Sequence, residues 1–526
     1  MADSARDQDT LAWLEKAGEA LRNPQPAESR RSHPPRVLQA LYDAASLNEF
    51  TSQYWRRADL LSPDESLSPE VRRTIRSRAR FECSENDSIL MGIVLQLAND
   101  LIGTGPRPQV AFRTRTDNRE QAQAIERAWR KWADKIGLQR KLKTARVAKA
   151  IDGETFLLMV TNRRLARLDA TAVTLDVRVI EADQIESPFL DPGNPRQLDG
   201  ITLDDEGNID HYTVLKHHPG GAFASDYDTD DIPAERMFHL FRQVRPGQHR
   251  GISELAPGLP LAALLRDFTI AVLHAARTAA KHTAVLQTNS PEITEEVMPY
   301  TSVPIDMDMQ TVLPAGYALH QLKAEQPTTT FGQFSETIIN MIARCVLMPF
   351  NIAIGNSSSY NYASGRLDYQ AYDLANREER SDWERRALTP LFEAFVWEAS
   401  RSGAIPADIL IDDVEVTWMW DGRDHVDPSK ESNAAALNLR TGKTHRRREY
   451  AKEGLDVDVE DEIAAKDLGM TIPEYRVWLR DNIAQVTGQR EEDRELSEDL
   501  AAQQAKAAKA AAAKTQPTRE RAGAAA

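Results

Sequence analysis

One stretch has the residue types of a phosphate-binding loop. Residues 440–447 read RTGKTHRR, and Gly442, Lys443 and Thr444 match the end of a P-loop, whose backbone amides and lysine hold nucleotide phosphates. The full motif requires a glycine five positions before Gly442, where this chain has Leu437. A strand should also come first, yet SKESNAAALNLR has a helical pattern. We interpret Gly442 as a helix stop and Thr444 as the N-cap of a new helix.

A second group offers metal-ligand types. His425 lies among Asp421, Asp424 and Asp427, but the spacing matches neither HExxH nor a calcium-binding loop. Asp, His and Pro together are typical of a turn, and no GxSxG or GxGxxG follows a strand. We therefore predict no catalytic residue, no metal ion and no cofactor, and a protein that is not an enzyme.

A third stretch has no charge until its end. Residues 351–366 read NIAIGNSSSYNYASGR, between two helical patterns. A loop of this length in a globular chain usually has a function. Hydroxyl and amide groups make weak, replaceable contacts, so the stretch suits a surface along which another molecule slides. The alternative is an ordinary surface loop between two helices.

Composition limits the classes of protein. The chain has 526 residues, a net charge of −15, 41% hydrophobic residues and 28% charged residues. This weighs against tight binding of nucleic acid through phosphate contacts. The two cysteines, Cys83 and Cys345, cannot build a disulfide framework, and we expect both to be reduced and buried in a cytosolic compartment. The polar N-terminus shows no signal peptide, and charges interrupt the most apolar helix pattern, so we expect no membrane span.

The hydrophobic periods predict an α+β protein. Helical patterns cover 69–103 and 119–150, and five short β-rich segments with turns between them follow from 155 to 242, as expected for a mostly antiparallel sheet. Helices are expected at 259–286, 331–348 and 367–401, the last kinked at Pro390. VEVTWMW (414–420) reads as a strand, and 428–485 as short helices. The Ala/Lys/Gln-rich tail is expected to be disordered.

Four segments, in order, resemble the lambda-type portal proteins of tailed bacteriophages, which form head–tail connector rings. They span 76–110, 239–268, 359–378 and 427–464, and the most specific is RPGQHRG (245–251) leading into a Leu-rich helix. The resemblance extends over about residues 75–470.

The resemblance implies a portal fold with an α+β wing, a two-helix stem, a clip insertion, a long kinked helix and a helical crown. The expected parts are a flexible arm (1–35), the wing (36–258), stem helix 1 (259–286), the clip (287–330), stem helix 2 (331–348), a tunnel loop (351–366), the long kinked helix (367–401), a wing strand return (402–426), crown helices (427–490) and a disordered tail (491–526).

The implied function is a portal ring at the capsid vertex, a channel for DNA packaging and ejection that docks the terminase motor and joins head to tail. Expected partners are other copies in a twelvefold ring, double-stranded DNA passing without sequence preference, the terminase large subunit, the major capsid and scaffold proteins, and a head–tail adaptor. The expected location is the virion, after assembly in the host cytoplasm. The alternatives are an ATPase or nuclease of the packaging motor, or a different head–tail or capsid subunit.

Two sets of residues follow from this layout. The channel loop would present its polar and aromatic side chains to DNA: Asn356, Ser357, Ser358, Ser359, Tyr360, Asn361, Tyr362 and Arg366. Tyr360 and Tyr362 would point the same way in extended backbone. The stem would pack between subunits through apolar residues at helical spacing: Leu261, Leu264, Leu265, Phe268 and Val272.

Overall fold

The computed structural model describes residues 58–113, 119–167, 172–188, 194, 196–222, 228–281, 285–288, 317–320, 331–358, 360–407, 409, 411–422, 428–452 and 455–482. The chain divides into two compact units, Met1–Ser62 and Pro63–Ala526, and every element below belongs to the second. The predicted arm (1–35) and tail (491–526), and nearly all of the predicted clip (287–330), lie outside the described residues.

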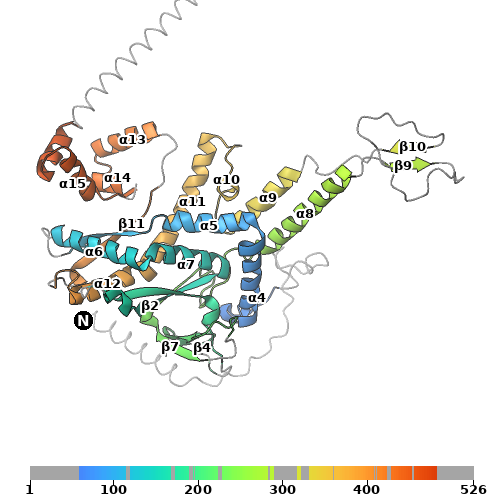
Figure 1. Ribbon diagram of the computed structural model, residues 1–526, viewed down its shortest axis with the longest axis horizontal. Helices are drawn as coiled ribbons and strands as arrows, with labels where there is room; N and C mark the ends of the chain where they lie inside the picture. The colour runs from blue at the N-terminus through green and yellow to red at the C-terminus, as the bar shows by residue number, and fades with distance from the viewer. Residues whose placement is uncertain are drawn as a thin grey trace, which may run out of the picture. The chain divides into compact units, whose positions relative to one another are not determined.

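Two antiparallel sheets packed face to face form the centre of the region from 154 to 241 (Figure 1). One has the order β3-β2-β8, from β2 (Glu154–Thr161), β3 (Leu175–Ile180) and β8 (Met237–Phe241). The other has the order β4-β5-β6-β7, from β4 (Gln197–Leu198), β5 (Ile201–Leu203), β6 (Ile209–Leu215) and β7 (Thr229–Pro233). The expected single sheet is therefore two, although all the pairings are antiparallel as predicted.

Alternation along β2 places the three-stranded sheet between two layers. Phe156 and Leu158 pack with Ile201 and Tyr212 of the four-stranded sheet. Leu157, on the opposite face, belongs to a core with helices. Those helices are α6 (Arg119–Ile136), α7 (Leu138–Asp152) and α12 (Thr389–Ser402). The order of layers is thus helices, three-stranded sheet, four-stranded sheet.

Aromatic side chains anchor the helical layer. Trp129 and Trp132, three apart on α6, are both buried, and the Trp129 ring lies 5.2 Å from Phe395 in an edge-on arrangement. The Trp132 indole nitrogen donates a hydrogen bond of 2.8 Å to the Leu175 carbonyl oxygen on β3. The helix predicted over 119–150 is two helices, because Gly137 adopts a left-handed conformation (φ 64°) between them.

The helix predicted over 69–103 is also divided. It consists of α4 (Pro69–Arg80), a π-helical turn (Phe81–Asn86) and α5 (Ser88–Ile102). Asp87 starts α5 as its N-cap, accepting hydrogen bonds from the amides of Ile89 and Leu90. A strand that the sequence did not predict, β1 (Arg107–Phe112), follows and pairs with β11 (Val414–Met419). The six residues of β1 form a strand because they pair with β11, which is far away in the sequence.

Two helices and a small sheet follow the sheets in sequence. Helix α8 (Leu259–Lys281) ends five residues before the predicted boundary at 286, because β9 (Val285–Thr288) begins there and pairs with β10 (Tyr317–His320). Helix α9 (Phe331–Arg344) ends four residues before its predicted boundary at 348. Leu347 there has a positive φ of 57°, which a helix cannot contain.

The long helix has an irregular centre. It comprises α11 (Tyr362–Trp383), a π-helical segment (Glu384–Leu388) and α12, with Pro390 in the first turn of α12. Pro390 has no amide hydrogen to donate to the preceding turn, which accounts for the local break in the helical pattern. The C-terminal helices are α13 (Pro428–Arg440), α14 (Arg446–Lys452), α15 (Val457–Asp467) and residues 472–482.

The remaining short elements are the helix α3 (Pro63–Ser66), the helix α10 (Phe350–Ile354) and 3-10 turns at Arg163–Ala166, Ala182–Gln184, Ala234–Arg236 and Ile411–Asp413.

Candidate channel loop and subunit surfaces

The uncharged stretch is shorter as a loop than the sequence predicted. Its first residues belong to α10, and Tyr362 already starts α11, so the connection runs from Gly355 to Asn361. Helix α10 forms because it buries Asn351 and Ala353, and it ends at Gly355 in the left-handed conformation (φ 67°). Asn361 caps α11 by accepting a hydrogen bond of 2.8 Å from the Ser364 amide.

These bounds change two expectations. Gly365 lies inside α11 rather than at the end of a loop. Tyr362 is helical, so Tyr360 and Tyr362 do not share the single extended segment on which their expected common direction depended. The sequence contained the signals, Gly355 as a helix stop and Asn361 as an N-cap.

The loop residues that the structure describes are open to solvent. Asn356, Ser357, Ser358 and Asn361 are exposed, as is Arg366 on the first turns of α11. Short local hydrogen bonds shape the turn: the Ser358 amide donates to the Asn356 side chain at 2.9 Å, and the Tyr360 amide to the Ser357 carbonyl oxygen at 3.1 Å. Ser359 and the side chain of Tyr362 lie outside the described residues.

The electrostatic surroundings of the loop are acidic. Partial desolvation, followed by the nearby carboxylates of Asp368 and Glu336, raises the pKa of the Tyr360 phenol. Asp368 belongs to α11 and Glu336 to α9. A polyanion passing here would meet weak polar groups and negative charge, with Arg366 as the nearby cation in the sequence.

The predicted stem residues divide into two groups. Leu265 and Val272 on α8 are only 6% and 7% exposed, so they pack inside their own chain, and the prediction that they pack between subunits is wrong. Leu264 is 66% exposed and Phe268 40%, while Leu261 is half-buried. The reason is that α8 packs against α9 within the chain: the Phe268 ring lies 5.8 Å from Phe331, stacked, and 5.4 Å from Phe334.

Much apolar surface of α8 remains uncovered. Residues Leu259–Arg277 are long and apolar enough to cross a membrane by length and composition, and 22% of that window is buried. A charged group interrupts the segment, since Arg266 is paired with Glu82 at 2.6 Å. The exposed side chains, among them Leu264, Ile270 and Leu273, make this helix a candidate protein–protein surface.

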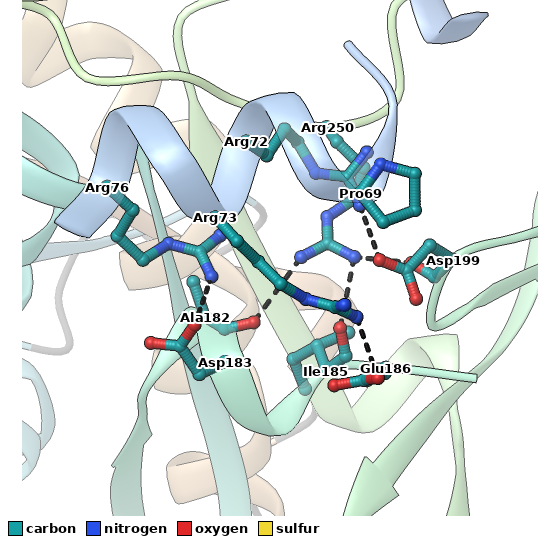
Figure 2. Close-up of a pocket in the computed structure, with 10 residues that line it drawn as sticks. All are labelled: Pro69, Arg72, Arg73, Arg76, Ala182, Asp183, Ile185, Glu186, Asp199 and Arg250. Atoms are coloured by element: carbon teal, nitrogen blue, oxygen red, sulfur yellow. Dashed lines mark hydrogen bonds and ion pairs between the residues drawn. The ribbon is translucent and has the colours of Figure 1, made fainter. Parts of the chain in front are cut away.

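A buried ionic network joins α4 to the two sheets, and Figure 2 shows the part of it in which Arg72 meets Asp199 and Arg76 meets Asp183. Glu154, fully buried at the start of β2, receives hydrogen bonds from Arg250 at 2.6 Å, Arg76 at 3.3 Å and His239 at 3.1 Å. Burial alone would raise the pKa of Glu154, but the charge of Arg250 and the hydrogen bond from His239 hold it well below its usual range. Sequence reasoning missed this network, although Arg72, Arg76 and Arg80 recur every four residues on α4.

The same network explains the motif RPGQHRG. Arg250 is buried and also donates to the Ile185 carbonyl oxygen at 3.1 Å. The Gly251 amide donates to Glu154 at 2.9 Å, and a Cβ at Gly251 would lie 2.3 Å from the Gly153 carbonyl oxygen. Only glycine allows this approach of two backbones. The motif therefore has a structural role in fixing the start of the α8 segment to the sheets.

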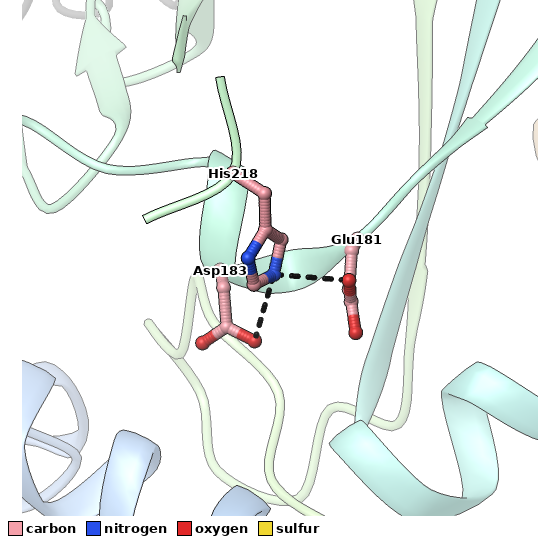
Figure 3. Close-up of side chains that lie close together, drawn as sticks. All are labelled: Glu181, Asp183 and His218. Atoms are coloured by element: carbon pink, nitrogen blue, oxygen red, sulfur yellow. Dashed lines mark ion pairs between the residues drawn. The ribbon is translucent and has the colours of Figure 1, made fainter. Parts of the chain in front are cut away.

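One His/Glu/Asp group has metal-ligand types but is arranged as an ion-pair cluster (Figure 3). Nε2 of His218 lies 3.0 Å from Glu181 and 4.0 Å from Asp183. The Gly220 amide donates to Nδ1 at 3.0 Å, which leaves Nε2 facing the two carboxylates. Arg80 already pairs with both carboxylates, at 2.8 and 2.7 Å.

The other sequence candidates have structural roles where they are described. Asp421 accepts a hydrogen bond of 2.6 Å from the Thr104 hydroxyl and pairs with Arg107 at 3.2 Å. Asp424, His425 and Asp427 lie outside the described residues. Gly442 ends a helix in the left-handed conformation, as predicted, whereas the next helix starts at Arg446, so that His445 rather than Thr444 precedes it. Cys83 is buried, and Cys345 is only half-buried.

Residues 51–378 match the family described as "Phage portal protein, lambda family". This is more than half of the chain, and the chain belongs to that family. Portal proteins are structural components and not enzymes, in agreement with the prediction from the missing motifs.

A curated relative is similar over part of its length. It is the "Probable portal protein" of Halomonas phage phiHAP-1, 23% identical over 284 residues, which are 50% of this chain and 54% of the relative. The chain thus spans about half the length of the curated relative that it matches.

Solved structures with distant likeness come from gene transfer agent particles. The neck of an empty particle, computed with C6 symmetry, has a TM-score of 0.39 at 12% identity, covering 70% of this chain and 90% of that chain. A chain of the native virion has a TM-score of 0.40 at 13% identity, covering 73% of this chain and 93% of that chain. The native neck, computed with C12 symmetry, has a TM-score of 0.39 at 12% identity, covering 73% of this chain and 94% of that chain. Scores this low do not establish a common fold.

Proposed function

We propose that this chain assembles into a twelvefold portal ring at a capsid vertex, through which double-stranded DNA is packaged and ejected. In this proposal residues 63–258 and β11 form the wing, α8 and α9 the stem, the insertion between them the clip, α11 to α12 the long kinked helix, and the C-terminal helices the crown. The ring assembles in the host cytoplasm with capsid and scaffold proteins, docks the terminase large subunit, and later joins the head to a tail adaptor.

The observation that carries the proposal is the uncharged connection Gly355–Asn361 between α10 and the long α11, in which Gly355 to Ser358 and Asn361 are exposed. A channel for DNA requires contacts that form and break easily, since an array of cations would hold phosphates through counterion release. Twelve chains of net charge −15 would carry a formal −180, and the carboxylates near Tyr360 add local repulsion. Both features favour sliding over retention.

Electron microscopy of the purified protein tests the ring directly. We expect a ring with a central hole, with the segment 355–361 facing the hole. Monomers at every concentration, or rings with this segment on the outer surface, would refute the proposal.

The substitution Ser358→Lys tests the role of the loop. Each ring would gain about twelve cations at one level, so we expect tighter binding of duplex DNA with a steeper dependence on salt, slower packaging, and unchanged ring assembly. The matched control is Ser358→Gln, which has a similar length without charge. If Ser358→Lys packages DNA and binds it like the control, the loop does not contact DNA.

A further inference from the structure

Opposite charges collect in two parts of the chain. Residues 119–167 contain thirteen basic and five acidic side chains, a net of +8, in a protein of net −15. Residues 199–235 contain ten acidic side chains and one basic side chain, Lys216, a net of −9. The first segment makes α6, α7 and β2, and the second makes β5, β6 and β7.

Eight basic side chains line two cavities, and we call them together the basic face: Arg127, Lys131, Lys135, Arg140, Lys141, Arg163, Arg164 and Arg178. Five of these residues line a cavity of about 810 Å³ at the β3 edge, and three line a neighbouring cavity of about 380 Å³. Lys141 pairs with Asp176 at 2.5 Å. Arg163, Arg164 and Arg178 are exposed and have no ion-pair partner among the described residues.

The negative charge lies on the four-stranded sheet and its turns, which we call the acidic lobe (residues 199–222 and 228–235). Strand β7 forms the edge of this sheet and carries Asp230 and Asp231, both exposed. Lys216 pairs with Asp228 at 2.7 Å and Asp230 at 3.5 Å, one cation shared by two carboxylates. Asp199 pairs with Arg72 and Asp205 with Arg196. The lobe carboxylates without an ion pair among the described residues are those of Asp204, Glu206, Asp231 and Glu235.

Most of the two charged surfaces lie on different sides of the three-stranded sheet, although Arg178 on β3 shares the face of Leu158, toward the four-stranded sheet. The helices of the basic face pack on one side of the three-stranded sheet, and the acidic lobe packs on the other (Figure 1). The strand β2 between them carries the buried side chains Phe156, Leu157 and Leu158. The exposed charges that have no ion pair among the described residues, among them Arg163, Arg164 and Asp231, are available to a partner.

We propose that, in the ring, the basic face of each subunit docks on the acidic lobe of the next copy. This inference rests on the proposed ring, because a cyclic assembly above a dimer needs two different, complementary surfaces on each subunit. Two surfaces of opposite charge, carried by different elements of the subunit, provide them. Duplex DNA would match the basic face alone and would be repelled by the acidic lobe. Complementary charge fixes orientation and speeds encounter, and like charges at such a contact are strongly unfavourable.

Two charge reversals test the contact. Arg163→Glu/Arg164→Glu inverts part of the basic face, and Asp230→Arg/Asp231→Arg inverts the β7 edge. For each variant alone we expect the subunit concentration at half assembly, measured by analytical ultracentrifugation, to rise about tenfold or more. In an equimolar mixture, alternating copies pair opposite charges at every contact, so assembly should return to nearly the wild-type concentration. Arg448→Glu, an exposed reversal on α14, is the matched control and should assemble like the wild type.

The outcomes separate this contact from the ring itself. Wild-type rings that assemble equally with both variants, or variants whose mixture recovers no more than either alone, overturn the contact and leave the ring standing. Absence of rings in the wild type refutes both. A third outcome is that the wild type retains a 30-bp duplex and that only Arg163→Glu/Arg164→Glu abolishes this retention, with unchanged assembly. This outcome assigns the basic face to DNA and also overturns the contact. If Asp230→Arg/Asp231→Arg fails to fold in thermal melts, Asp205→Arg/Glu206→Arg on the same lobe replaces it.

Discussion

At the scale of residues, buried charge connects distant parts of the chain. Glu154, Arg76 and Arg250 come from β2, α4 and the motif before α8, and each is nearly inaccessible to solvent. Removing one partner of a buried charge pair typically costs about 3–5 kcal/mol, because the other charge is left without compensation. The network therefore supports the geometry of the whole region rather than a chemical reaction.

Glu126 is a half-buried carboxyl of a different kind. Its Oε1 accepts a hydrogen bond of 2.7 Å from the Val110 amide, and burial raises its pKa to about 7. Between the ordinary Glu pKa and about pH 7, the folded chain therefore keeps the proton of Glu126, whereas the unfolded chain has lost it. The stability that this proton contributes is lost as the pH rises through about 7.

We expect Glu126→Gln to remove this loss while keeping the acceptor oxygen for Val110. At pH 8 the variant should be more stable than the wild type by about 1–3 kcal/mol, and at pH 4 the two should be similar. Urea unfolding at both pH values measures the difference, with exposed Glu120→Gln as the matched control. Equal stability of variant and wild type at pH 8 would contradict the raised pKa.

At the scale of elements, helix α8 has one face that is buried within its own chain and another that is exposed to solvent. Leu265 is buried and the neighbouring Leu264 is 66% exposed. The helical period places consecutive residues about 100° apart, so one helix can carry both faces. The exposed face fits the contact between subunits that a ring requires.

The two neighbouring leucines provide a matched pair of variants. Leu265→Asp should destabilise the isolated chain by about 3 kcal/mol or more, because it buries a carboxylate where a leucine packed. Leu264→Asp should change that stability by less than about 0.5 kcal/mol and yet raise the concentration needed for ring assembly. Denaturant unfolding of the monomer and sedimentation of the assembly measure the two effects. Equal losses of stability in both variants would mean that both side chains pack within the chain.

At the scale of the whole molecule, the described region is suited to assembly rather than to turnover of a nucleotide. The amides that would face phosphates in RTGKT already bond within a helix end: Thr441 to the Leu437 carbonyl oxygen, Gly442 to Leu439 and Thr444 to Asn438. The residues before them form α13 instead of a strand.

We therefore expect the assembled protein to release no phosphate from ATP above the buffer rate. Lys443→Ala should leave this baseline unchanged, since Lys443 lies in an exposed turn. Phosphate release with millimolar MgATP is the measurement. Turnover that Lys443→Ala abolishes would point to a packaging ATPase and would count against the portal function.

The sequence by itself determined those features that depend on near neighbours. The α+β class, the type of most elements, the break near Pro390 and the missing P-loop glycine all follow from periods, caps and spacings within a few residues. The four ordered segments also indicated the family that the match over 51–378 establishes. The uncharged character of 355–361 was readable for the same reason, although the lengths of α10 and α11 were not.

Only the tertiary structure decided which groups meet. It paired β1 with β11, divided the strands into two sheets, buried Leu265 and exposed Leu264, and surrounded Glu154 with Arg76, Arg250 and His239. It also placed most of the basic and acidic surfaces on different sides of one sheet. These outcomes depend on contacts between residues far apart in the chain. A local pattern states that a helix has an apolar side but does not state what covers it.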